Sequence, residues 1–327
     1  MANGFKPVCH GFLLRLLCIK CFIDNVLDSI SFFVSFLPLG KILFVRNAYK
    51  KVKNHKKGID KLGILRYTIY KFCFGGDPLP RFFVTSSQID GDTVTILGED
   101  AHHLSRALRA AVGDTVTVCD MSRTEYECEL TDFLPDRVLA RVLSARPADT
   151  ESPVCVTLYQ ALPKGDKLDT VIHKAVECGV CRIVPFESER CVVRAKADSE
   201  ARKTERRNRI ASEAAKQCGR GLLPEVAPTV SFDEMMTQAS KADAVLFCYE
   251  GDGTEPIGRL LARLAPQTGG TLALVIGSEG GFSLAEAERA RKQGFYMTGL
   301  GKRILRTETA PLFALACISC CLELSGT

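Results

Sequence analysis

The sequence predicts an α/β fold with a mostly parallel sheet, preceded by a smaller β-rich domain. From Pro153 onward, apolar runs of strand length alternate with amphipathic segments of helix length, which is typical of strands joined by crossover helices. Between Arg81 and about Ala148, short β-rich runs are separated by Gly-Asp turns. A basic, aromatic-rich leader precedes both regions. We therefore expect a leader at 1–78, a small domain at 79–150 and an α/β domain at 151–327.

The charge of the chain is unevenly distributed. The net charge of +5 suggests a nucleic-acid binder, but residues 1–80 hold 13 Lys and Arg against 4 Asp and Glu. The remainder holds 30 basic and 34 acidic residues, so it is slightly acidic. This balance excludes a general polyanion binder, and any RNA site must be a local patch of basic side chains.

The leader matches neither a signal peptide nor a membrane span. Arg15 and Lys20 interrupt the apolar stretch that a signal peptide needs. The longest uncharged run, Ser29 to Gly40, has 12 residues and contains Pro38, whereas a spanning helix needs about 20. The alternative is an interfacial helix followed by the basic run at 50–57. We expect a cytoplasmic protein, with no membrane contact unless the leader provides it.

The small domain is predicted to be a β-barrel-like unit. Strands are expected at 81–84, 94–97, 115–119, 126–130 and 138–142, where residues alternate or run apolar. One helix interrupts them at about 100–111, with Asp100 as its expected N-cap.

The larger domain follows a linker at Pro147–Pro153. Strands are expected at 154–162, 182–186, 244–249 and 272–277, and helices at 166–178, 199–218, 283–293 and about 308–324. The helix at 283–293 carries a capping box, formed by Ser283 and Glu286.

Two glycine-rich segments follow strands of this domain. Val275-Ile-Gly-Ser-Glu-Gly-Gly-Phe-Ser283 joins an apolar strand to a capped helix, and such glycines allow a ligand to approach the backbone closely. The alternative is a tight turn without a ligand. The segment lacks the Gly-Lys-Ser/Thr of a P-loop and the glycine spacing of a dinucleotide fingerprint.

The second segment, Thr298-Gly-Leu-Gly-Lys-Arg-Ile-Leu-Arg-Thr-Glu-Thr-Ala310, adds a polar cluster at 306–309 before the last helix. A structural alternative is that Thr307 caps this helix while Glu308 favours its positive end. Open α/β sheets bind ligands at the carboxyl ends of their strands, so the two segments together favour a binding site.

The 15 cysteines do not predict a metal site. Cys178 and Cys181 form a CxxC pair, but no histidine has a partnering spacing, and a zinc site needs four ligands. We expect no metal and reduced thiols.

Several motifs together resemble the RsmE family, the ribosomal RNA small subunit methyltransferase E proteins of the SPOUT class. The resemblance covers Leu79 to about Leu324. Its most specific parts are Ile276-Gly-Ser-Glu-Gly-Gly-Phe and Leu300-Gly-Lys-Arg-Ile-Leu-Arg-Thr-Glu-Thr-Ala310. Pro80-Arg-Phe-Phe-Val, Gln160-Ala-Leu-Pro-Lys-Gly-Asp-Lys and Ala214-Ala-Lys-Gln-Cys-Gly-Arg220 support it. Ser278 and Cys178 depart from the family, which usually has Pro and Leu there.

The resemblance implies a PUA-like RNA-binding N-terminal domain, a C-terminal domain with a deep trefoil knot, and a homodimer. It also bears on the leader, because family members commonly begin Met-Pro-Arg-Phe-Phe-Val. Bacteria can initiate at leucine codons, so we expect Leu79 to be the true start and 1–78 to be translated upstream sequence. The alternative is a genuine extension.

The resemblance further implies an enzyme that transfers a methyl group from S-adenosylmethionine to N3 of a uridine in 16S rRNA of the small ribosomal subunit. The alternatives are a related SPOUT enzyme that methylates a ribose 2′-hydroxyl, and a non-catalytic ribosome assembly factor. The implied catalytic residues are Arg306, which stabilises the uridine anion, and Glu279 or Glu308 as the base. The implied cofactor-binding residues are Ile276, Gly277, Ser278, Glu279, Gly280, Gly281, Leu300, Gly301, Ile304, Leu305, Arg306, Thr307, Thr309 and Ala310. The implied RNA-binding residues are Arg81, Arg106, Arg109, Lys164, Lys167, Lys174, Arg190 and Arg220.

Overall fold

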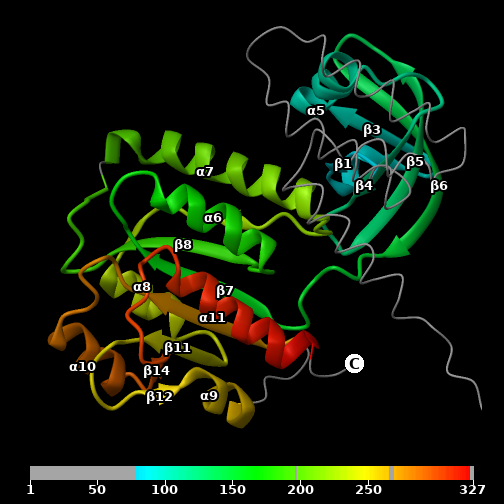
Figure 1. The fold of residues 1–327 in the computed structure, drawn as a ribbon. Helices are drawn as coiled ribbons and strands as arrows, with labels where there is room; N and C mark the ends of the chain where they lie inside the picture. The colour runs from blue at the N-terminus through cyan, green and yellow to red at the C-terminus, as the bar shows by residue number, and fades with distance from the viewer. Residues whose placement is uncertain (1–78, 196, 265–268, 325–327) are drawn as a thin grey trace, which may run out of the picture. The chain divides into compact units, whose positions relative to one another are not determined.

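The computed structural model describes residues 79–195, 197–264 and 269–324, which contain two sheets, each with its own apolar core (Figure 1). The predictions about the leader, including its membrane contact and the start at Leu79, lie outside the described residues, apart from Leu79 itself.

The first sheet has the order β1-β4-β5-β6-β3-β2. Its strands are β1 (Arg81–Phe83), β2 (Ile89–Asp90), β3 (Thr93–Leu97), β4 (Thr115–Cys119), β5 (Thr124–Phe133) and β6 (Arg137–Pro147). Among the described strands of this sheet, β1 and β4 pair in parallel, and all other neighbours pair antiparallel. The five predicted strands are thus confirmed, and alternate residues of each point into a core that includes Phe82, Ile96, Val118 and Leu130.

The helix expected at about 100–111 begins earlier and changes character. It consists of α5 (Gly98–His102) and a π-helical stretch, η2 (His103–Leu108), and the next residue, Arg109, is left-handed at φ 52°. The prediction that Asp100 is the N-cap is wrong, because Leu97 occupies that position. Asp100 instead accepts a hydrogen bond from Lys216 Nζ at 2.5 Å, so an ion pair with a distant helix replaces the cap.

The second sheet is parallel in every described pair, with the order β10-β8-β7-β13-β11-β14-β12 and β9 beside β8. Its strands are β7 (Cys155–Ala161), β8 (Arg182–Glu187), β9 (Glu225–Val226), β10 (Val230–Ser231), β11 (Ala244–Cys248), β12 (Glu255–Pro256), β13 (Thr271–Ile276) and β14 (Tyr296–Gly299). The central strands are covered on both faces, which explains their continuous apolar runs.

Helices cover both faces of this sheet (Figure 1). The helices α6 (Lys167–Glu177), α7 (Ala197–Cys218), α9 (Ile257–Leu264) and α11 (Ala310–Ser319) lie on one face, and α8 (Phe232–Ala239) and α10 (Leu284–Lys292) lie on the other. The predicted α/β architecture is confirmed, as is the capping box of Ser283 and Glu286. The last helix begins at Ala310 and passes into a π-helical end, η3 (Cys320–Leu324).

Candidate functional site

The candidate site is built from loops that follow parallel strands. Because β7, β13, β11 and β14 are parallel, the segments that follow them leave the sheet at the same edge. In the order of the sheet, β11 lies between β13 and β14, while β7 flanks β13 on the other side. The two predicted glycine segments, after β13 and after β14, therefore meet at one edge of the sheet.

A buried latch joins these segments. Gln160, the penultimate residue of β7, donates from Nε2 to Thr307 Oγ1 at 3.1 Å and to the Gly277 carbonyl at 3.4 Å. Thr307 Oγ1 in turn donates to the Gly277 carbonyl at 2.9 Å. Gln160 and Thr307 are both buried. The alternative prediction that Thr307 caps the last helix is therefore wrong, because Thr309 occupies the N-cap position. The Thr307 hydroxyl instead connects the second glycine segment to Gln160 and Gly277.

Two glycines of the first segment lie close to neighbouring groups. A Cβ on Gly277 would lie 3.2 Å from the Gly281 Cα and 3.2 Å from the Phe282 ring. Gly281 is left-handed at φ 62°, and a Cβ there would lie 2.1 Å from Glu250 Oε1. The left-handed conformation favours glycine at position 281, and a side chain at position 277 would require its neighbours to shift.

Gly281→Ala tests this crowding. We expect a loss of about 1–2 kcal/mol of stability from the left-handed conformation and, in addition, weaker cofactor binding, since Glu250 must move. Gly294→Ala is the matched control, because Gly294 is also left-handed but has open space around its Cβ position. Chemical denaturation and calorimetric titration with S-adenosylmethionine measure the two effects. Equal affinity losses in both variants would show that crowding at Gly281 plays no part.

The loop after β11 also contributes to this edge, although it was not among the predicted site segments. Glu250 approaches Gly281, and Thr254 Oγ1 lies 3.0 Å from where a Gly299 Cβ would stand. The signal was available, because Glu250-Gly-Asp-Gly253 follows a predicted strand just as the other two glycine segments do.

Two carboxylates of the site share one lysine. Lys167 Nζ lies 2.7 Å from Glu279 Oε1 and 3.7 Å from Glu308 Oε2. Glu279 Oε1 also accepts a hydrogen bond from the Lys164 backbone N–H at 3.1 Å. Partial burial opposes ionisation of Glu279, but the hydrogen bond and charge of Lys167 and the hydrogen bonds from the backbone N–H groups of Glu279 and Lys164 together outweigh it, so the pKa of Glu279 is lowered. The structure thus brings both predicted base candidates together around Lys167.

The rest of the second glycine segment is open to solvent. Arg306 is exposed, and its carbonyl accepts hydrogen bonds from the N–H groups of Thr309 and Ala310, which form a turn. Ile304 is 85% exposed, and Gly301 is left-handed at φ 103° with no atom near its Cβ position.

These features fit an adenosine-containing cofactor. An exposed apolar side chain beside accessible glycine backbone suits a flat base, and the buried Gln160 Oε1 and Glu308 Oε2 have no hydrogen-bond partner within the described part of the chain. The residues that would hold S-adenosylmethionine are therefore those of the segments after β13 and β14.

The predicted RNA-binding residues fall into different environments. Arg106, Arg109, Lys164, Lys174 and Arg190 are exposed. Lys174 pairs with Glu177, and Arg190 Nη1 donates to the Gly280 carbonyl at 3.0 Å, so Arg190 supports the first glycine segment. Lys167 belongs to the carboxylate cluster.

Arg220 and Arg81 are placed in the interior instead. The Arg220 guanidinium lies 2.6 Å from Glu151 Oε2 and donates to the carbonyls of Val176 and Val180, each at 3.0 Å. Arg81 pairs with Glu125 at 2.7 Å and donates to the Arg220 carbonyl at 3.1 Å. Arg220, with 4% of its side chain exposed, has no surface to offer to a phosphate. It packs the end of α7 against the linker.

Because Arg106 is exposed and Lys167 is paired with carboxylates, their removal should affect the salt dependence of RNA binding differently. Arg106→Ala should reduce the slope of log K against log salt concentration by about 0.7–0.9, the value for one lost phosphate contact. Lys167→Ala should leave the slope unchanged, because Lys167 is engaged by Glu279 and Glu308. Filter binding of an rRNA fragment over a salt series measures both. A reduced slope for Lys167→Ala would show that Lys167 does contact an RNA phosphate.

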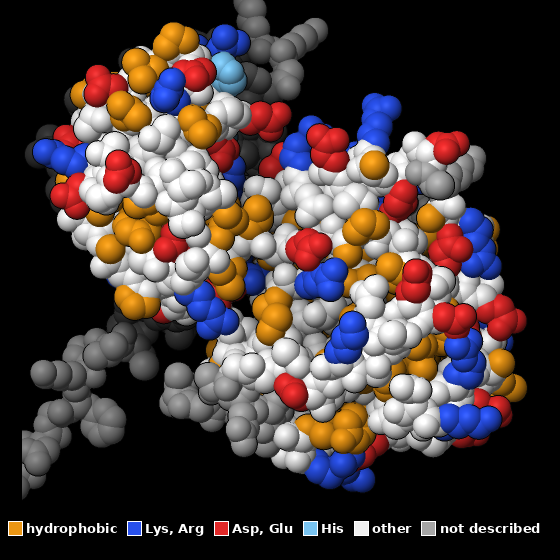
Figure 2. Space-filling model, turned by 180° about the vertical axis from the view of Figure 1, so that it is seen from behind, with side chains coloured by type: hydrophobic (Ala, Val, Ile, Leu, Met, Phe, Trp, Pro, Cys, Tyr) orange, Lys and Arg blue, Asp and Glu red, His pale blue; other side chains and the backbone are white. Residues whose placement is uncertain are grey.

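On the face that Figure 2 shows, the basic side chains of the described residues do not gather into one large patch. On the face drawn in Figure 2, Lys and Arg are interspersed with Asp and Glu. Within residues 79–195, 197–264 and 269–324, no three His, Cys, Asp or Glu side chains gather as a metal site would require, and no helix is long and apolar enough to cross a bilayer.

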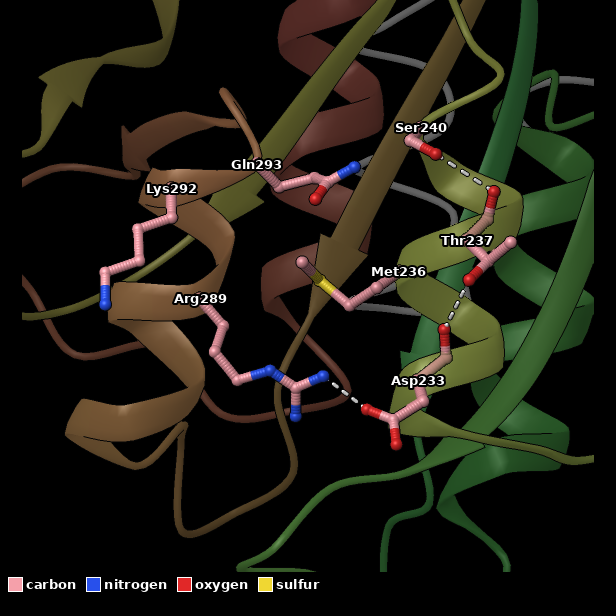
Figure 3. Close-up of a pocket in the computed structure, with 7 residues that line it drawn as sticks. All are labelled: Asp233, Met236, Thr237, Ser240, Arg289, Lys292 and Gln293. Atoms are coloured by element: carbon pink, nitrogen blue, oxygen red, sulfur yellow. Dashed lines mark hydrogen bonds and ion pairs between the residues drawn. The ribbon is translucent and has the colours of Figure 1, made fainter.

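A separate groove of about 490 Å³ lies between α8 and α10 (Figure 3). Its lining residues are Asp233, Met236, Thr237, Ser240, Arg289, Lys292 and Gln293. Arg289 pairs with Asp233 across it. None of these residues belongs to the glycine segments, so we do not place the cofactor there.

Comparisons with known proteins show the family to which the chain belongs. Residues 150–319 match the family described as RNA methyltransferase domain. The chain is 36% identical over 253 residues to the ribosomal RNA small subunit methyltransferase E of Bacillus subtilis (strain 168), covering 75% of this chain and 98% of the relative.

Solved structures give the same result. A ribosomal RNA small subunit methyltransferase E from Neisseria gonorrhoeae bound to S-adenosyl methionine is 32% identical, with a TM-score of 0.62, covering 74% of this chain and 97% of that one. A methyltransferase from Legionella pneumophila in complex with the cofactor SAM is 29% identical, with a TM-score of 0.65 and coverages of 74% and 97%. The chain belongs to the ribosomal RNA small subunit methyltransferase E family.

Proposed function

We propose that this protein is an S-adenosylmethionine-dependent methyltransferase that modifies N3 of a uridine in 16S rRNA. The observation that carries the proposal is the latch of Gln160, Gly277 and Thr307, which holds the two glycine segments and the Arg306–Thr309 turn in one site. The names of the relatives and the two cofactor-bound structures support the reaction and the cofactor.

The chain's own residues can perform three tasks. The backbone at Gly277, Gly281 and Gly301, with the apolar Ile304 and Leu305, would bind the cofactor, which supplies an electrophilic methyl group. Arg306 would stabilise the negative charge that develops on the uracil ring as N3 loses its proton. N3 belongs to the pairing edge of the base, so the uridine must be unpaired or flipped out to reach the site.

We further propose a PUA-like RNA-binding domain at 79–150 and a SPOUT methyltransferase domain with a deep trefoil knot at 151–327, as the family resemblance implies. Their separate apolar cores support that boundary. An enzyme that acts on rRNA would work in the cytoplasm.

We also propose a homodimer. The helix α11 is apolar around its whole circumference, and a helix of that kind is normally buried. Phe313 is 38% exposed, Leu324 is 68% exposed and Cys320 is exposed as well. The helical face that carries Cys317, Cys320 and Cys321 is thus only partly buried, and a second copy of the chain would cover it.

Nucleoside analysis tests the function. Purified protein, S-adenosylmethionine and small ribosomal subunits from a strain that lacks the modification should yield N3-methyluridine by mass spectrometry. A 2′-O-methylated nucleoside would instead establish the related ribose methyltransferase. Cofactor or RNA binding without any methyl transfer would establish the assembly factor.

A further inference from the structure

The carboxylate of Glu308, unlike that of Glu279, has a buried oxygen without a hydrogen-bond donor among the described residues. Its Oε2 atom is buried and accepts no hydrogen bond from any described residue, and its nearest cation is Lys167 Nζ at 3.7 Å. A buried polar atom without a partner costs free energy, and native proteins retain such atoms where a task requires them. A quarter of the Glu308 side chain stays exposed, so a substrate can reach it.

Glu279 is engaged in a different way. One of its oxygens accepts hydrogen bonds from both Lys167 Nζ and the Lys164 N–H. These donors hold the carboxylate in its charged form and tie the first glycine segment to the start of α6. A carboxylate held in this way is a weak proton acceptor, and its contacts indicate an orienting role.

The position of Glu308 is fixed by its neighbours. Thr307, the preceding residue, is locked by the latch to Gln160 and Gly277. Arg306 lies on the same turn and acts electrostatically on Lys167. The charged groups that surround Glu308 are thus Lys167 from α6, Glu279 from the loop after β13 and Arg306 from its own turn.

We propose that Glu308 is the general base of the methyl transfer, and that Lys167 is a positioning residue whose positive charge holds the carboxylates of Glu279 and Glu308 on either side of it. The inference rests on the proposed function. The N3–H bond breaks and its proton passes to the Glu308 carboxylate. The N3 electron pair forms the bond to the methyl carbon, and the pair of the broken methyl–sulfur bond stays on the sulfur of the cofactor. Arg306 compensates the charge on the ring while the proton leaves.

Glu308→Gln tests the base, with Glu279→Gln as the matched control. General-base loss is expected to lower kcat by about 10²–10⁴-fold in Glu308→Gln, with cofactor affinity by calorimetry near that of the unchanged protein. Glu279→Gln should mainly raise the KM for the cofactor. Both variants keep the shape of the side chain.

Changing the acidity of the substrate N3–H distinguishes a general-base role of Glu308 from a structural one. A 5-fluorouridine at the target position has a more acidic N3–H, and alkaline pH ionises N3 without help. Each change should narrow the gap in kcat between Glu308→Gln and the unchanged protein. Lys167→Arg should retain most of the activity, while Lys167→Met should lower it.

The outcomes are distinct. If Glu308→Gln methylates at the full rate, or if its deficit is the same on both RNAs and at all pH values, Glu308 is not the base. If Glu279→Gln shows the rescued deficit instead, the two roles are reversed. If the unchanged protein forms no N3-methyluridine, the proposed function fails before the variants are compared.

Discussion

Replacing Arg306 with alanine is expected to lower the rate of methyl transfer by about 10²–10³-fold, the loss that follows removal of one group that stabilises a developing anion. The guanidinium is exposed at the mouth of the site, on a turn fixed by the Thr307 latch, and its pairing with a uracil oxygen would strengthen as N3 loses its proton. Single-turnover rates at saturating cofactor measure this effect separately from cofactor binding.

Arg303→Ala is the control for Arg306, because Arg303 is an exposed arginine of the same segment that lies before the latch. It should retain a rate close to that of the unchanged protein. Full N3-methylation by Arg306→Ala at saturating cofactor would remove Arg306 from the mechanism.

Replacing Arg220 with methionine is expected to destabilise the fold by about 3–5 kcal/mol, the cost of leaving one member of a buried ion pair alone. The Arg220 and Glu151 side chains are 4% and 2% exposed, and Glu151 Oε1 also accepts from the N–H groups of Gly221 and Leu222. Urea denaturation measures the change. Arg263→Ala, which breaks a partly exposed pair with Glu255, should cost only about 0–1 kcal/mol.

The ion pair of Arg220 and Glu151 also predicts how the free energy of unfolding falls at low pH. Burial disfavours the charged form of Glu151, but the hydrogen bonds and charge of Arg220 outweigh it and lower the pKa of Glu151. A lowered folded-state pKa gives stability that is complete above the unfolded value of about 4.3 and is lost as pH falls through the folded value. Arg220→Met should therefore lose less stability than the unchanged protein below that pH. Parallel acid limbs in the two proteins would contradict this account.

Local features of the fold were predictable from short stretches of sequence. The strands of the first sheet alternate, the central strands of the second run apolar, and Ser283 with Glu286 marks the start of α10. The glycines at 277 and 281 mark the candidate loop, since their spacing between a strand and a helix is itself local. The helix α8 was missed, although Ser231 and Glu234 form a similar capping box.

The environments of individual arginines could not be predicted from the sequence. Arg106 and Arg220 were both predicted to contact RNA, because the family resemblance implies it for each. The structure leaves Arg106 on the surface and surrounds Arg220 with Glu151 and two backbone carbonyls. Whether a charged side chain is exposed or buried depends on the groups that pack against it, and those groups cannot be identified from residue spacing.

By itself, the sequence determined the main strands and helices, the parallel sheet and the two glycine segments, because periodicity and turn chemistry act over a few residues. Only the tertiary structure decided which groups meet. Gln160 bonds to Thr307 across 147 positions of the chain, and Lys167 reaches Glu279 across 112. Such contacts arise from the order of strands in the sheet, which brings the ends of β7, β13 and β14 to one edge. That order is set by the packing of the whole domain.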